Sequence, residues 1–169
     1  MNLIEIEERK DIYQLNTVYF FNRPVLGKIL ILPRSSAQNF VYEKPWACIS
    51  IATDPSELAK INQVQRVELL QLTFEDLEGC PAGFAEKFPE KAKNMFTEAH
   101  AQQILEFSKK WWNKIDLLMI HCYAGVSRSP AVGKALSDIY QSGFSDYFDM
   151  MFSPNKMVYS TIKKVYANE

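Results

Sequence analysis

The chain has 169 residues, of which 47% are hydrophobic and 13% aromatic, so it is long and apolar enough to bury one complete core. Nineteen basic and twenty acidic residues leave a formal net charge of −1, which argues against general attraction to nucleic acids or to membrane surfaces. We therefore expect a single domain over residues 1–169, with residues 1–20 at its periphery.

The cysteines and the N-terminus indicate the compartment. Three cysteines, an odd number, do not form a disulfide framework. Residues 1–10 are too charged for a signal peptide, and no apolar run is long enough to cross a membrane. The sequence predicts a reducing, cytoplasmic location, which also suits a reactive thiol.

The first twenty residues favour no single structure. Ile4 and Ile6 alternate as in a strand, whereas residues 7–15 could form a polar helical turn. Both interpretations stay open.

Three segments then predict strands: a compact apolar strand at residues 28–32, a buried strand at 46–52, and a third at 67–74, where Leu70, Leu72 and Phe74 alternate. Gly27 and Pro33 bound the first strand, and Asp54-Pro55 ends the second. Residues 34–36 are predicted as a polar connection. Cys48 lies within the second strand and is most simply a core residue.

The next segments predict an acidic loop and a series of helices. Residues 75–83 form the loop, which two glycines and a proline interrupt. Pro89 divides residues 84–96 into two short helical pieces. Thr97 can cap a longer helix, whose apolar stripe contains Ala101, Ile104, Leu105, Ser108, Trp111 and Trp112. His100 lies beside this stripe as a partly exposed helix residue, because no second metal ligand has suitable spacing.

A strand, a loop and a helix follow. Residues 117–120 form the strand, residues 121–129 the loop, and the apolar spacing after Pro130 predicts a helix that ends at Ser142-Gly143. Ser129 is the predicted N-cap, with Pro130 at the first helical position. The loop therefore ends on a helix N-terminus, where free N–H groups and the helix dipole attract an anion.

Ser153-Pro154 opens the last predicted helix, on which Val158, Ile162, Val165 and Tyr166 face the core. Strands that alternate with helices predict an α/β domain with a mostly parallel central sheet flanked by helices. The loop at 121–129 then lies at the carboxyl end of a central strand, where open sheets usually bind ligands.

Cys122 and Arg128 give this loop its chemistry. Five residues separate them, and Gly125 between them can adopt the backbone angles of a tight cradle. Inward-pointing amides and the Arg128 charge favour the thiolate form of Cys122. The planar guanidinium of Arg128 fits two oxygens of a phosphate. The alternative is a buried structural cysteine beside a surface arginine.

The run from His121 to Ser129, with Cys122, Gly125 and Arg128 at their places in it, resembles the signature of the cysteine-dependent protein tyrosine and dual-specificity phosphatases. The resemblance implies the fold of these phosphatases and hydrolysis of phosphate monoesters through a cysteinyl-phosphate, with no cofactor and no metal ion. It is firm over residues 116–139.

The resemblance also implies roles for individual residues. Cys122 is the nucleophile, Arg128 binds the phosphate, and His121 supports the loop from behind. Ser129 either donates its hydroxyl to the departing sulfur or simply caps the helix. The phosphate also meets the backbone N–H groups of Tyr123, Ala124, Gly125, Val126 and Ser127.

Relatives carry a general acid on a loop after an upstream strand, and Asp76 matches this place best. Glu75 and Glu78 are the rivals, and a loop of solvated acids is the alternative. If Asp76 is the acid, residues 79–96 form a mobile flank over the cleft. Pro154-Asn155 is similar to a Pro-Asn pair in dual-specificity relatives, but the residues that follow differ, so Asn155 receives no role.

The loop side chains favour a protein substrate. Phosphoinositide phosphatases often carry lysines in this loop, whereas Tyr123, Ala124, Val126 and Ser127 add no charge. We expect a monomer that acts on phosphotyrosine in a protein or peptide, with phosphoserine and phosphothreonine open. Phosphoinositides, RNA 5′-phosphates and a phosphate-binding module without turnover are the alternatives, and thiol redox chemistry is expected only as regulation.

Overall fold

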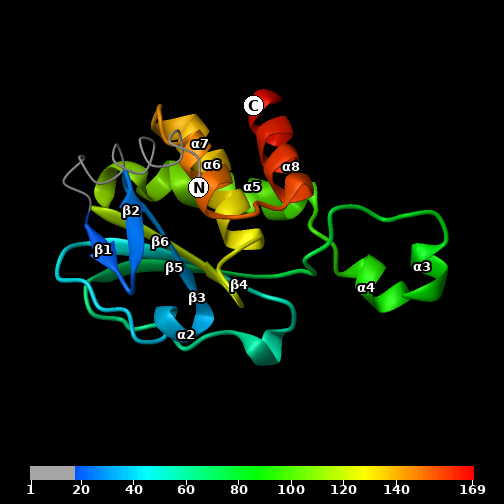
Figure 1. The fold of residues 1–169 in the computed structure, drawn as a ribbon, viewed down its shortest axis with the longest axis horizontal. Helices are drawn as coiled ribbons and strands as arrows, with labels where there is room; N and C mark the ends of the chain where they lie inside the picture. Colours follow the sequence, from blue (N-terminus) through cyan, green and yellow to red (C-terminus); the bar gives the residue numbers. More distant parts are fainter. Residues whose placement is uncertain (1–17) are drawn as a thin grey trace, which may run out of the picture.

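The structure, a computed structural model, describes residues 18–169, so the alternatives for residues 4–15 lie outside the described residues. Residues 18–169 contain a six-stranded sheet with the strand order β1-β2-β3-β6-β4-β5. The four strands β3 (Ile29–Pro33), β6 (Leu117–Cys122), β4 (Trp46–Ala52) and β5 (Arg66–Thr73) run parallel to one another. This confirms the mostly parallel sheet that the sequence predicts (Figure 1).

A short hairpin that the sequence did not predict extends the sheet at one edge. It joins β1 (Tyr19–Phe20) to β2 (Arg23–Leu26) through Phe21 and Asn22, which both have positive φ, as a two-residue hairpin turn requires. Because β2 runs antiparallel to β3, this turn lies at the carboxyl edge of the parallel strands.

Both faces of the sheet are covered, so every residue of the two central strands β4 and β6 is buried and nearly all of them are apolar. On one face, Ile31, Ile49 and Ile120 belong to the core that packs against α5 (Glu98–Trp111), α6 (Arg128–Tyr140) and α8 (Lys156–Ala167) (Figure 1). On the other face, Leu32, Cys48 and Met119 pack with Phe40 and Trp46. Cys48 is a core residue, as predicted.

The helices differ from the predictions in several places. Thr97 caps α5 as predicted. The prediction of Ser129 as N-cap is wrong: α6 begins at Arg128 and Ser127 is its N-cap. Pro130 tolerates this earlier start because amides in the first turn have no intrahelical acceptor. α8 begins at Lys156, and Tyr166 is 43% exposed rather than in the core.

Four further short elements lie outside the sheet. The helices α2 (Arg34–Ala37) and α7 (Ser145–Met151) were not predicted. Two 3-10 turns cover Pro55–Glu57 and Trp112–Lys114. None of the helices in residues 18–169 combines the length and apolar composition needed to cross a bilayer.

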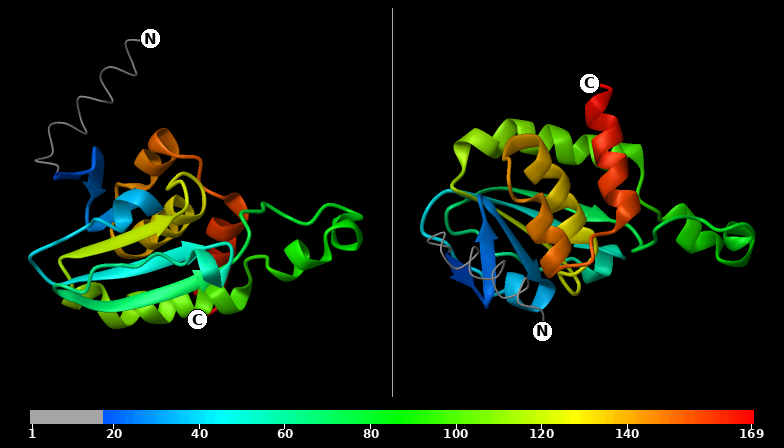
Figure 2. Two further views of the ribbon diagram at one scale, coloured as in Figure 1. Left: turned by 90° about the horizontal axis from the view of Figure 1, so that it is seen from below. Right: turned by 45° about the horizontal axis from the view of Figure 1, so that its top comes forward.

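The segment after β5 forms an arm with two short helices, α3 (Phe84–Lys87) and α4 (Pro89–Lys93), which confirms the predicted break. Figures 1 and 2 show the arm projecting away from the sheet and its covering helices. It therefore does not lie over the loop as the expected flank. Asn94 fixes its base, since its carbonyl accepts the Glu75 amide at 2.7 Å and its side chain donates to the Thr53 carbonyl at 2.8 Å.

Candidate active site

The signature loop, residues 122–128, leaves the end of the central strand β6 and enters α6. Its carbonyls are held by donors outside the loop. Those of Tyr123, Val126 and Ser127 accept backbone amides at 3.0 Å, from Arg34, Ser153 and Asn155 respectively. The Gly125 carbonyl accepts the Arg23 guanidinium at 3.1 Å.

With its carbonyls turned outward, the loop leaves its amides for a ligand. Within residues 18–169, none of the backbone N–H groups of residues 123–127 donates a hydrogen bond. The side chains of Tyr123 and Val126 are exposed, at 70% and 41%. The loop therefore presents a concave set of free amides, which is an anion-binding arrangement.

Gly125 makes this close-packed loop possible. Its φ is +64°, and a Cβ on it would lie 2.7 Å from both the Leu32 carbonyl carbon and the Pro33 nitrogen. Only glycine permits both this conformation and this approach of the loop to β3.

Cys122 lies at the base of the loop and is 3% exposed. Its Sγ accepts a hydrogen bond from Ser129 Oγ at 3.2 Å. Ser129 is fully buried in the first turn of α6, so its hydroxyl is turned to the sulfur and does not cap the helix. A hydroxyl in this place stabilises negative charge on the sulfur.

Arg128, the first residue of α6, is oriented by two contacts on one side of its guanidinium. Nη1 donates to the Phe74 carbonyl at 2.8 Å and to Thr53 Oγ1 at 3.0 Å. Its Nε is buried and has no hydrogen-bond partner among residues 18–169. A buried N–H without a partner is costly, so it indicates a place for an anion oxygen.

Asp76 lies beside the loop. Its Oδ1 accepts hydrogen bonds from Ser127 Oγ and from Asn155 Nδ2, both at 2.8 Å. Asn155 is fully buried and also donates to the Leu77 carbonyl at 3.1 Å. The structure thus brings Asp76 to the signature loop, and Asn155, which the sequence left without a role, holds it there.

The two rival carboxylates lie differently. Glu78 Oε1 accepts the Lys156 amide at 3.0 Å, so Glu78 is bound to the start of α8. Glu75 joins the base of the arm through its amide. The acid whose carboxylate contacts the signature loop is Asp76.

His121 lies behind the loop and is 1% exposed. Its Nε2 is 2.7 Å from Ser50 Oγ on β4, and its Nδ1 is 3.5 Å from the Cys122 carbonyl. Burial lowers the pKa of His121 to about 4, and the Arg34 charge adds to this effect. The imidazole is therefore neutral at pH 7 and connects β4 to the loop.

Neither a protein-family model nor a curated protein matches the sequence. Solved structures do match. Human DUSP28 is 14% identical, with 84% of this chain and 93% of that one covered and a TM-score of 0.55. PTPMT1 in complex with PI(5)P is 15% identical, with 84% and 94% covered and a TM-score of 0.50. The chain has the dual-specificity phosphatase fold.

Several residues that build this phosphatase-fold site carry no sequence signal. Arg23, Ser50 and Thr53 lie far from the signature in the chain, and they reach it because β4 lies beside β6 and ends at the same sheet edge, where β2 begins. The Pro-Asn pair was the one available hint for Asn155.

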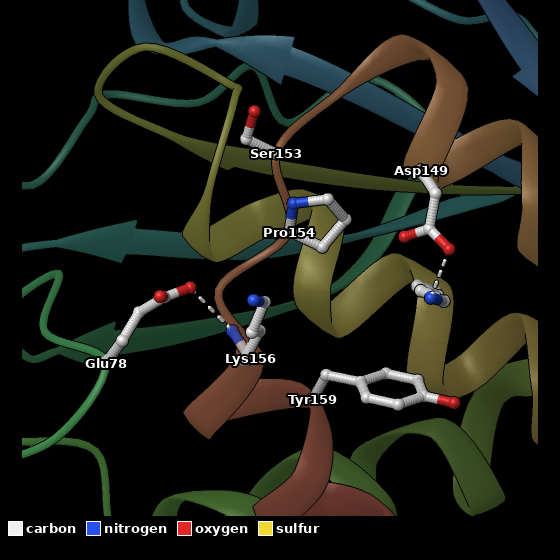
Figure 3. Close-up of a pocket in the computed structure, with 7 residues that line it drawn as sticks. Glu78, Asp149, Ser153, Pro154, Lys156 and Tyr159 are labelled. Atoms are coloured by element: carbon white, nitrogen blue, oxygen red, sulfur yellow. Dashed lines mark hydrogen bonds and ion pairs between the residues drawn. The ribbon is translucent and has the colours of Figure 1, made fainter.

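Ser153 and Pro154, from the segment that bonds the loop, also line a cavity of about 650 Å³ (Figure 3). Its lining carries two lysines and two carboxylates, which are Lys134, Lys156, Glu78 and Asp149. Lys134 Nζ lies 2.6 Å from Asp149 Oδ2. These charges balance, so the cavity lining has no net charge that would attract an anion.

His100 is part of the capping box of α5 and stacks on Phe96, with ring centroids 5.5 Å apart. Among residues 18–169 no group of three or more His, Cys, Asp or Glu side chains is arranged to hold a metal ion. The structural role that the sequence indicates for His100 fits these contacts.

Proposed function

We propose that this protein hydrolyses phosphate monoesters on protein tyrosine, with serine and threonine as further candidate targets, through a cysteinyl-phosphate on Cys122. The observation that carries the proposal is a set of donors on the loop that have no partner among residues 18–169. Five loop amides and the buried Nε of Arg128 converge on one loop, with Cys122 at its base. The bonded Nη1 leaves the Nε edge of the guanidinium for two phosphate oxygens.

In the first step, the Cys122 thiolate attacks phosphorus. The P–S bond forms as the P–O bond to the substrate breaks, and the Asp76 carboxylic acid gives its proton to the leaving oxygen. The amides and Arg128 stabilise the charge on the equatorial oxygens.

In the second step, water attacks the phosphorus of the cysteinyl-phosphate and loses a proton to the Asp76 carboxylate. The P–S bond breaks and inorganic phosphate leaves. Ser129 Oγ, at 3.2 Å from the sulfur, stabilises the departing thiolate. His121 acts as a support, because a neutral imidazole bonded to Ser50 fixes the strand end that carries Cys122.

The cysteines support a reducing compartment such as the cytoplasm. Cys48 and Cys122 are buried and unpaired, and Cys80 is exposed on the arm as a free thiol. A nucleophilic thiol stays active where disulfides are kept reduced.

The test is turnover of an aryl phosphate, followed by a panel of phosphotyrosine and phosphothreonine peptides, phosphoinositides and 5′-triphosphorylated RNA. We expect phosphotyrosine peptides to be hydrolysed best, with activity unchanged in a chelator. Cys122→Ser should lose on the order of 10³-fold or more in kcat and still bind the peptide, whereas Cys80→Ser should stay active. Binding without turnover in the wild type would instead indicate a phosphate-binding module.

A further inference from the structure

Arg23 lies at the signature loop although it is about a hundred residues away in the chain. It follows the turn of the β1–β2 hairpin and pairs with Phe20 across it. Since β2 is antiparallel to β3, the start of β2 lies at the same sheet edge as Cys122, which pairs with Pro33.

Two contacts fix the guanidinium of Arg23. Nη1 donates to the Gly125 carbonyl at 3.1 Å, and the guanidinium carbon lies 5.2 Å from the centre of the Phe152 ring. Phe152 follows α7, so the cation joins the hairpin, the loop and the segment after α7. A planar cation suits both the ring face and the carbonyl.

The positive charge of Arg23 lies at the loop that carries Cys122, because its guanidinium bonds the Gly125 carbonyl. Within residues 18–169 no carboxylate lies within salt-bridge distance of its guanidinium. Burial lowers the pKa of Arg23, and attraction to the negative charge of Cys122 opposes that change. The Arg23 guanidinium and a negative charge on Cys122 therefore attract each other.

We propose that Arg23 is a positioning residue of this active site, which holds the Gly125 carbonyl outward and supplies a second positive charge for the Cys122 thiolate. This inference rests on the proposed function. The hydrogen bond from Arg23 to the Gly125 carbonyl lies at the centre of the loop. A carbonyl turned inward at this place would repel a phosphate oxygen.

Several other groups surround Cys122 and must be held constant in a test. Arg128 comes from α6, and His121 precedes the cysteine on β6. Asp76 reaches the loop through Ser127, and Arg34 of α2 bonds the Tyr123 carbonyl. A change at Arg23 alone leaves each of these groups in the protein.

The experiment compares Arg23→Gln and Arg23→Lys with Arg66→Gln. Arg66 is a matched control, because its Nη1 also donates to backbone carbonyls, those of Ile61 and Asn62, but it lies at the opposite end of the parallel strands. The readouts are the pH dependence of Cys122 alkylation by iodoacetamide, followed by mass spectrometry, and the affinity for orthovanadate.

For Arg23→Gln we expect the midpoint of the alkylation profile to rise by roughly one pH unit and vanadate to bind about tenfold more weakly. Arg66→Gln should match the wild type in both. A folded Arg23→Gln protein with the wild-type alkylation profile and vanadate affinity would overturn the proposal.

Arg23→Lys keeps the positive charge but loses the planar guanidinium. It tests the positioning role if the Arg23→Gln protein does not fold. We expect its alkylation midpoint to stay near the wild type and its vanadate affinity to fall several-fold. An unchanged vanadate affinity would exclude the positioning role. Neither readout requires turnover, so a wild type without phosphatase activity would refute the proposed function separately from the role of Arg23.

Discussion

The carboxylate of Asp76 accepts a hydrogen bond from the hydroxyl of Ser127, with 2.8 Å between Oδ1 and Oγ, although the residues are 51 positions apart. The loop after β5 is thereby joined to the signature loop at the point where α6 begins. Asn155, the N-cap of α8, bonds the same oxygen and completes the connection. The candidate acid therefore has a fixed place beside the signature loop, held by two hydrogen bonds to one carboxylate oxygen.

Replacement of this acid tests its role directly. Asp76→Asn should lower kcat roughly 10²- to 10³-fold for alkyl phosphates, whose poor leaving groups need a proton, and less for aryl phosphates. The basic limb of the pH–rate profile should disappear. Glu78→Gln is the control, since Glu78 bonds the Lys156 amide instead of the loop. Equal losses in the two variants would contradict the assignment to Asp76.

The hydroxyl of Ser129 should matter more for the second chemical step than for the first. Ser129→Ala removes the donor to Cys122 Sγ, and loss of a hydrogen bond to a charged group corresponds to a roughly 10- to 100-fold lower rate. Rapid-quench kinetics should show a burst of released alcohol followed by slow turnover. A burst rate that falls as much as the steady-state rate would mean that Ser129 acts mainly on thiolate formation.

Burial of His121 links stability to pH. Its pKa is lowered to about 4 in the folded protein, whereas an unfolded chain takes up this proton near pH 6.5. The unfolded state therefore binds more protons between these values, and the free energy of unfolding should fall by about 3 kcal/mol as the pH drops from 6.5 to 4.

Urea unfolding at several pH values gives the free energy of unfolding of the wild type and of His121→Gln. The contribution of His121 is the difference between the two proteins in how steeply this free energy changes with pH. The ring resonances of His121 in NMR spectra should show a neutral imidazole down to about pH 4. Protonation near pH 6.5 in the folded protein would show that burial does not control this group.

A comparison of Gly125 with Gly143 distinguishes the effect of backbone conformation on stability from the effect of close packing. Gly125 and Gly143 both have positive φ, but a Cβ would meet neighbouring atoms only at Gly125. Gly143→Ala should cost about 1 kcal/mol of stability, and Gly125→Ala roughly 2–5 kcal/mol, because the overlap with β3 is added. Only Gly125→Ala should abolish vanadate binding. Similar effects of the two substitutions in both measurements would rule out this packing argument.

The local features of the site could be predicted from sequence. The strand, loop and helix around Cys122 are predicted by the spacing of apolar residues and by the positions of Gly125 and Pro130, which all lie within one short stretch of the chain. The prediction failed for Ser129 as N-cap, because a hydroxyl can bond either an amide or a sulfur and the sequence does not choose between them. The β1–β2 hairpin was missed because its strands are too short to show a period.

By itself the sequence determined the α/β class, the strands of the parallel sheet and a loop that joins a thiol to a guanidinium, since these depend on residues near one another in the chain. Only the tertiary structure decided which side chains orient that loop. Arg23, Ser50, Thr53, Asp76 and Asn155 come from four separate segments, and the sequence alone does not show that these segments lie close together in space. Packing of the parallel strands brings their ends to one edge, and there the contacts of the site are formed.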